Sequence, residues 1–235
     1  MHLAVLMTNT DESAFSQAHP KDGEKFQALL QELRPDWQVS VFAVKDGIFP
    51  PESARFDGYL ITGSPASVHD AAHWTEPLLG LIRRIVADGV PLFGACFGHQ
   101  AIAVALGGMV GDNPGGWVLG LARTEMEGRK ISLYAAHREQ VLALPPGAVA
   151  LGGNADCPVG SFAIGRNVLT TQYHPEMTAG FIAELTDYLA QDLPDKVIAA
   201  ARASLAGKSD NAGMALRIVR FFEGAQITET SRNAS

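Results

Sequence analysis

The chain has 235 residues, of which 47% are hydrophobic and 18% charged, and its formal net charge is −7. This length and composition predict one α/β domain with a substantial core, with or without an appended helical piece. The acidic balance argues against a nucleic-acid partner, because proteins that bind phosphate backbones carry basic patches. No apolar run approaches membrane-spanning length and the N-terminus lacks the pattern of a signal peptide, so we expect a cytoplasmic protein without membrane contact.

The first third of the chain alternates strand and helix patterns. Residues 2–7 become a continuous apolar run, as in a central parallel strand. Residues 26–33 carry apolar side chains at helical spacing, and residues 37–44 alternate as a second strand. Residues 59–61 predict a third strand. Strands that alternate with helices indicate a parallel sheet.

The connection after the first strand, residues 8–23, is long and polar for a strand-to-helix loop. Loops at the carboxyl ends of parallel strands line the ligand crevice of such sheets. Residues 11–25 therefore have two interpretations of about equal weight. They help to receive a second substrate, or they form an inert excursion on the surface.

A glycine turn with the sequence TGSP follows the third strand at residues 62–65. Small residues here let backbone amides approach a reacting group, so the amides of Gly63 and Ser64 are candidates for half of an oxyanion hole. Gly-Ser-Pro is also simply a good turn, and alone this motif is weak.

His69, Asp70 and His73 precede the next helix, whose apolar positions fall between residues 78 and 86. Two histidines beside an aspartate suggest a metal site. We discount it and expect neither metal nor cofactor, because no comparable ligand cluster accompanies them. Solvated polar groups at a helix entry are the favoured interpretation.

A thiol lies where an apolar strand, residues 90–95, meets a helix whose apolar face begins at residue 102. The segment 94–100 has the sequence GACFGHQ, with a glycine two residues before and two after Cys96. This is the cysteine counterpart of the nucleophile elbow G-x-S-x-G, and the positive end of the helix favours thiolate. A buried structural cysteine is the alternative, which the two glycines disfavour. The Phe97 amide would complete the oxyanion hole.

Residues 109–172 differ from the preceding chain, because they contain turn residues and short alternating segments that suggest an antiparallel flap beside the parallel sheet. The segments are 118–122, 131–135, 149–151, 162–164 and 168–172. The other cysteine, Cys157, lies here, and with only two cysteines we expect no disulfide framework.

Residues 170–176 are interpreted as a short strand that carries His174 and Glu176. Because residues i and i+2 of a strand point to one face, Glu176 can orient the imidazole toward Cys96. The result is a nucleophile, a base and an orienting carboxylate. A solvated loop histidine is the alternative. His137 is a rival base, but the acidic partner two residues away favours His174.

The last part of the chain predicts helices at residues 181–189, 197–205 and 214–222. We divide the chain into a catalytic domain, 1–190, and a helical extension, 191–235, packed on the same domain. The last two helices are interpreted as cover for the core, with a homodimer contact as the alternative.

Three motifs together resemble one family. They are ITGSP at residues 61–65, GACFGHQ at 94–100 and YHPE at 173–176. The chain resembles the class I, or triad, glutamine amidotransferases, and more narrowly their stand-alone domains similar to the amidotransferase part of GMP synthetase. The resemblance runs from about residue 56 to about residue 177. It implies a three-layer, flavodoxin-like, mostly parallel sheet with helices on both faces and a small antiparallel flap.

The resemblance also implies a substrate. The reacting carbonyl would be the side-chain amide of glutamine or of another γ-glutamyl compound, and Gln100 matches the glutamine that helps to bind it. Residues 135–139, with Ala136 and His137, occupy the place that holds the substrate's α-amino and α-carboxylate groups. Related enzymes commonly have two glycines before the proline of the turn, whereas this chain has Gly63 and Ser64.

Three functions stay open. The first is a glutamine amidotransferase or glutaminase-type hydrolase, whose ammonia could pass to a separate synthetase subunit, since the chain has no P-loop or pyrophosphate-binding run. The second is a γ-glutamyl peptidase that cleaves γ-glutamyl peptides or amines. The third is a non-catalytic regulatory or interaction module, which the intact set of Cys96, His174 and Glu176 disfavours.

Overall fold

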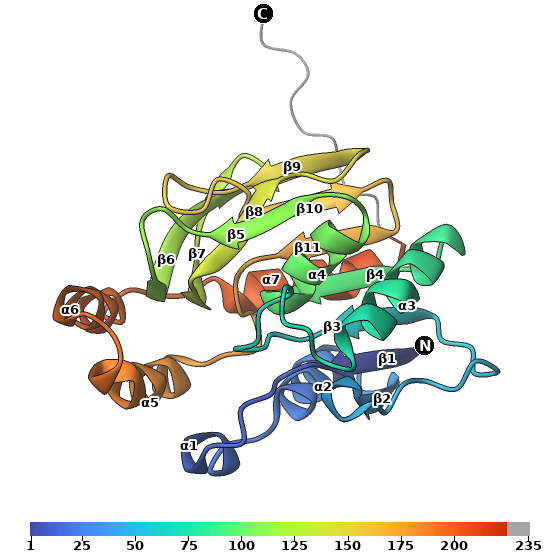
Figure 1. The fold of residues 1–235 in the computed structure, drawn as a ribbon, viewed down its shortest axis with the longest axis horizontal. Coiled ribbons are helices and arrows are strands. Elements are labelled where there is room, and N and C mark those ends of the chain that lie inside the picture. Colours follow the sequence, from blue (N-terminus) through green and yellow to red (C-terminus); the bar gives the residue numbers. More distant parts are fainter. Residues whose placement is uncertain (225–235) are drawn as a thin grey trace, which may run out of the picture.

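A seven-stranded sheet runs through the middle of the protein (Figure 1). The structure, a computed structural model, describes residues 1–224. Five strands are parallel, and the last two of the order are antiparallel at one edge. In spatial order the strands are β2 (Gln38–Ala43), β1 (His2–Met7), β3 (Gly58–Ile61), β4 (Leu92–Ala95), β11 (Val168–Thr171), β10 (Ser161–Ile164) and β9 (Ala148–Gly152).

Helices cover both faces of this sheet, because alternate strand residues point to opposite sides. Leu6 and Ile61 pack with α3 and α4 on one face, whereas Val5 and Leu60 pack with α2 and α7 on the other. The predicted three-layer α/β architecture is therefore confirmed. The helices are α1 (Ala14–Gln17), α2 (Asp22–Leu33), α3 (Thr75–Ala87), α4 (Phe97–Ala105), α5 (Ala179–Tyr188), α6 (Asp195–Ser204) and α7 (Asn211–Phe222), with 3₁₀ turns at Val44–Asp46 and Leu189–Gln191.

The antiparallel part is built differently from the expectation. It consists of two separate two-stranded sheets, β5 with β8 and β6 with β7. The later segments belong to the main sheet, since β11 pairs in parallel with β4 and β10 and β9 follow it. A short alternating strand has the same pattern in a flap as at a sheet edge, so periodicity could not separate the two. The bounds are β5 (Met109–Asp112), β6 (Val118–Met126), β7 (Arg129–His137) and β8 (Glu139–Ala143).

The C-terminal helices pack on the same body. Helix α7 places Met214, Ile218 and Phe222 in the core shared with α2, and Ser204 at the end of α6 accepts a hydrogen bond from the Leu121 amide of β6, 2.8 Å away. The division at residue 190 stays a proposal, and its last part, residues 225–235, lies outside the described residues. Among residues 1–224, no helix combines the length and apolar character that crossing a bilayer requires.

Candidate active site

Cys96 lies on a strained turn between β4 and α4. Its backbone has φ 49° and ψ −105°, a conformation that residues with a Cβ rarely adopt and that costs about 1–3 kcal/mol. The Cys96 amide donates to the Thr171 carbonyl of the neighbouring strand, 2.9 Å away, which fixes the turn. The turn therefore holds the thiol beyond the end of the sheet, as the elbow motif predicts.

The two glycines around Cys96 are required by close backbone contacts. A Cβ at Gly94 would lie 2.6 Å from the carbonyl carbon of Gly98, and a Cβ at Gly98 would lie 2.5 Å from the Ile61 oxygen. Both distances are shorter than real Cβ contacts, and the atoms involved are backbone atoms that cannot rotate away. Helix α4 can approach β3 and β4 this closely only because both residues lack a side chain.

We expect Gly98→Ala to lower the free energy of unfolding by about 1–3 kcal/mol, because the helix must shift away from the sheet. Gly213→Ala is the matched control, since a Cβ at Gly213 of α7 meets nothing within 4 Å. Alanine is the better helix former, so the control should be neutral or stabilising. Urea unfolding of both variants measures the difference, and equal midpoints would contradict the packing argument.

His174 and Glu176 form a buried pair. The imidazole Nδ1 lies 2.8 Å from Oε1 of Glu176, and the two residues are only 3% and 7% exposed. The predicted strand around them is wrong, because β11 ends at Thr171 and the chain then bends. The side-chain amide of Asn211 fixes this bend by donating to the carbonyl oxygens of residues 174, 175 and 177.

The thiol and the imidazole meet over Gly63. A Cβ at Gly63 would lie 2.9 Å from Cε1 of His174 and 3.5 Å from Cβ of Cys96. The second imidazole nitrogen, Nε2, makes no hydrogen bond of ordinary length to residues 1–224. Burial lowers the pKa of His174, but the interactions of the imidazole with Cys96 and Glu176, chiefly with their negative charges, outweigh burial and hold this pKa well above its usual value. Cys96 and Glu176 thus favour the protonated imidazole.

Backbone amides converge near the thiol. Gly63 and Ser64 line the same pocket as Cys96, and Phe97 begins α4. The Gly63 carbonyl accepts hydrogen bonds from the hydroxyls of Thr8 and Thr62, both 3.1 Å away. Because a trans peptide is planar, the Ser64 amide of that peptide points the opposite way, away from the threonines. In the described part of the chain, the amides of residues 63, 64 and 97 donate to no backbone carbonyl.

The other predicted substrate residues lie at different depths. Ala136 lines the pocket beside Cys96. Gln100 and His137 are buried and are not part of the pocket wall. Burial lowers the pKa of His137 to about 4, with a smaller contribution from His174, whereas the pKa of His174 is raised by Cys96 and Glu176. This contrast favours His174 over the rival base.

Gln100 is connected to the thiol of Cys96 by hydrogen bonds through Gln172, a residue that the sequence analysis did not single out. The Nε2 of Gln100 donates to the Glu139 carbonyl at 2.8 Å and to Oε1 of Gln172 at 3.2 Å. The Nε2 of Gln172 in turn lies 3.6 Å from the sulfur of Cys96. Gln172 directly precedes the YHPE motif of residues 173–176, and this position was the available signal. The role of Gln100 in substrate binding stays a prediction.

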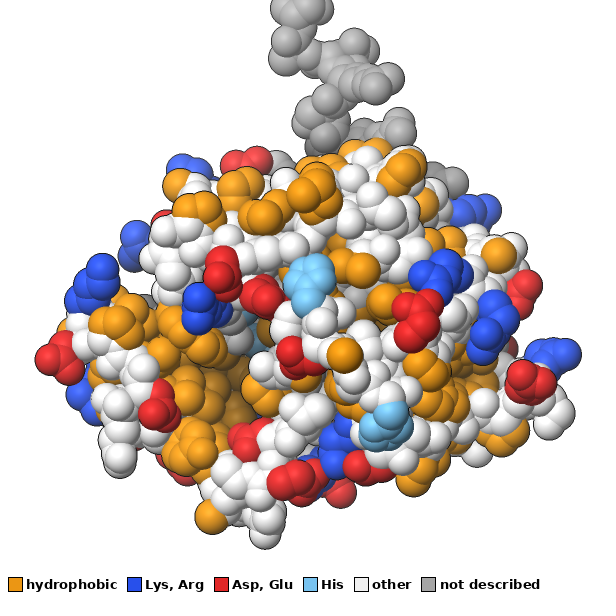
Figure 2. Space-filling model, viewed as in Figure 1, with side chains coloured by type: hydrophobic (Ala, Val, Ile, Leu, Met, Phe, Trp, Pro, Cys, Tyr) orange, Lys and Arg blue, Asp and Glu red, His pale blue; other side chains and the backbone are white. Residues whose placement is uncertain are grey.

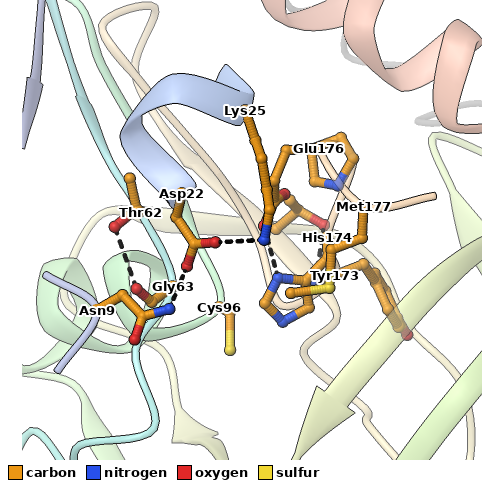
Figure 3. A network of polar contacts seen from close by, with 12 residues as sticks. Asn9, Asp22, Lys25, Thr62, Gly63, Cys96, Tyr173, His174, Glu176 and Met177 are labelled. Carbon is orange, nitrogen blue, oxygen red and sulfur yellow. Dashed lines mark hydrogen bonds and ion pairs between the residues drawn. The ribbon is translucent and has the colours of Figure 1, made fainter. Parts of the chain in front are cut away.

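The loop after β1 forms one side of the pocket, next to Cys96 and His174 (Figure 3). Asp22, at the start of α2, accepts a hydrogen bond from Asn9 at 2.7 Å and pairs with Lys25 at 2.9 Å. Asp22 is only 3% exposed. The cavity has a volume of about 360 Å³. The loop is therefore part of the site's wall, while its role toward a second substrate stays a prediction.

Comparison with known proteins decides the family. The model of the family described as glutamine amidotransferase class-I matches residues 26–185. The chain belongs to this family. It is 29% identical over 201 residues to γ-glutamyl peptidase 3 of Arabidopsis thaliana, covering 78% of this chain and 80% of that protein. It is 32% identical over 139 residues to the GMP synthase of Aromatoleum aromaticum, covering 52% of this chain and 26% of that protein.

Among solved structures, the chain is similar to a glutamine amido transferase from Methylobacillus flagellatus. The TM-score is 0.73 at 24% identity, and the match covers 99% of this chain and 98% of that one, which supports the fold. The family match begins at residue 26, so the loop after β1 and the first turn of α2, which contributes Asp22 and Lys25 to the pocket, lie before it. This part of the pocket is therefore outside the residues that the family model matches.

Proposed function

We propose that the protein hydrolyses γ-glutamyl amides, with Cys96 as nucleophile, His174 as acid and base, and Glu176 as the group that orients His174. The observation that carries this proposal is that a thiol on a strained turn lies beside a carboxylate-bound imidazole, in a pocket that Gly63 and Ser64 also line. A thiolate beside an imidazolium is suited to attack on a carbonyl carbon.

The reaction would proceed through a thioester. The sulfur of Cys96 attacks the γ-carbonyl carbon, and the resulting oxyanion accepts hydrogen bonds from the Phe97 amide and a Gly63 or Ser64 amide. The carbon–nitrogen bond breaks, and the amine leaves with the proton of His174. Neutral His174 then takes a proton from water, the hydroxide oxygen attacks the thioester, and glutamate and the thiol are released.

The comparisons support hydrolysis without a synthetase half. The γ-glutamyl peptidase relative matches over most of both chains, whereas the GMP synthase match covers only 26% of that protein. A second candidate is favoured by that GMP synthase match. The fold is also similar, with a TM-score of 0.57, to a solved structure from Thermoplasma acidophilum that is named for one subunit of a GMP synthase. In this candidate the protein hydrolyses glutamine and passes ammonia to a separate synthetase subunit.

The test is to incubate the purified protein with glutamine and with γ-glutamyl peptides and amides, and to follow free glutamate, ammonia and the released amine. We expect glutamate release from at least one substrate and none from the Cys96→Ser variant. Release of ammonia from glutamine alone would favour the synthetase-coupled candidate. The absence of turnover with every γ-glutamyl compound would refute the proposal.

A further inference from the structure

The outer half of the pocket is lined by aromatic side chains that come from two distant parts of the chain. We call this lining the aromatic wall. The ring of Phe15, in α1, stacks on Tyr188 at the end of α5, with centroids 4.8 Å apart and planes at 12°. Phe181 of α5 lies 5.7 Å from Phe15 and 5.0 Å from the ring of His19. Figure 2 shows this region as a hollow of hydrophobic side chains, between the positions of α1 and α5 in Figure 1.

Most charged side chains of this wall already have a partner within the protein. The ammonium of Lys25 binds the carboxylate of Asp22 and lies 3.7 Å above the centre of the Phe181 ring. Lys21 pairs with Glu12 outside the pocket at 3.8 Å, and Asp11 accepts the Ser13 amide at 2.8 Å. The remaining acid of the wall, Asp192, is exposed at the rim. Among the described residues that line this part of the pocket, no deeply buried charged side chain therefore needs a ligand of opposite charge as its partner.

The pocket also extends well beyond the reacting groups. The cavity of about 360 Å³ extends from Cys96 and His174 to Tyr188 and Leu189. An apolar group larger than ammonia can therefore occupy the space beyond the reacting carbon.

We propose that this aromatic wall is the subsite for the leaving amine, and that the preferred substrates are γ-glutamyl compounds whose amine carries an aromatic ring. The inference rests on the proposed hydrolysis, in which the carbon–nitrogen bond breaks and His174 protonates the departing nitrogen. An aromatic ring packs favourably against other rings at centroid distances of about 4.5–7 Å. Phe15 and Tyr188 both lie outside residues 26–185, the part of the chain that the family model matches.

The test compares kcat/KM for four substrates: glutamine, γ-glutamyl-glycine, γ-glutamyl-phenylalanine and γ-glutamyl-2-phenylethylamide. We expect the two aromatic substrates to exceed γ-glutamyl-glycine by about ten-fold or more, the range that apolar pocket contacts supply. The two differ in one carboxylate, so they separate an amino-acid leaving group from a simple amine. Phe15→Ala and Tyr188→Ala should each remove most of the aromatic advantage, whereas Val149→Ala, an exposed residue of β9, should retain it.

The outcomes separate this inference from the proposed function. An aromatic advantage that falls in Phe15→Ala and Tyr188→Ala supports the inference. Cys96-dependent cleavage without an aromatic advantage, or with an advantage that neither variant changes, overturns the subsite and leaves the proposed hydrolysis standing. No cleavage of any of the four substrates by the wild-type protein counts against both. Circular dichroism spectra verify that each variant is folded.

Discussion

The Cys96→Ser variant is expected to lose γ-glutamyl hydrolysis by about 10⁴-fold or more while its fold is retained, because a serine hydroxyl does not ionise near neutral pH as a thiol does. The serine side chain would still fit the turn, since it differs from that of cysteine by one atom and the strain at this position comes from the backbone. Steady-state release of glutamate measures the loss. A variant with wild-type turnover would exclude Cys96 as the nucleophile.

The second cysteine provides the control for this prediction. Burial, with smaller contributions from the negative charges of Cys96 and Asp156, raises the pKa of Cys157 to about 12. Cys157 therefore stays a neutral thiol at every pH used for assays. We expect iodoacetamide at pH 6 to label Cys96 and to leave Cys157 unmodified, as peptide mass spectrometry would show. Equal labelling of the two cysteines would contradict an activated thiol at position 96.

The elbow was predictable because its determinants are local. A buried strand, a helix pattern and two glycines lie within about a dozen residues, and close backbone contacts explain why positions 94 and 98 must be glycine. The His174–Glu176 contact was expected for a reason that proved wrong. Two residues apart on a strand share a face, but these two face each other across a bend.

Sequence periodicity could not predict contacts between residues that are far apart in the chain. Asn211, which stabilises that bend, lies 37 residues after His174, and no pattern at either position indicates the contact. The same holds for α1, a helix of four residues with no buried positions and no periodicity to detect. Its place against α5 depends on aromatic contacts between residues 15 and 188, which only the fold brings together. The catalytic motifs were therefore easier to predict than the aromatic lining of the pocket, which we propose selects the substrate.

Glu176→Gln is expected to lower kcat by about 10²–10⁴-fold with little change in KM, because the carboxylate orients the imidazole and stabilises its charged form. Glutamine keeps the size of the side chain but presents either a neutral oxygen or an N–H to Nδ1 of His174. The effect falls on kcat because Glu176 acts through His174 on the reacting atoms. Glu76→Gln, at an exposed glutamate of α3, is the matched control and should leave kcat unchanged.

The pH profile separates this electrostatic role from a structural one. Burial lowers the pKa of His174, but the charges of Cys96 and Glu176 outweigh burial and raise it. Removing the charge of Glu176 must therefore lower this pKa. The imidazolium that protonates the leaving amine is lost as pH rises through that pKa, so the alkaline limb of kcat/KM should move to lower pH in Glu176→Gln. A reduced rate with an unmoved limb would mean that Glu176 only maintains the bend around His174, and that its charge does not act on the imidazole.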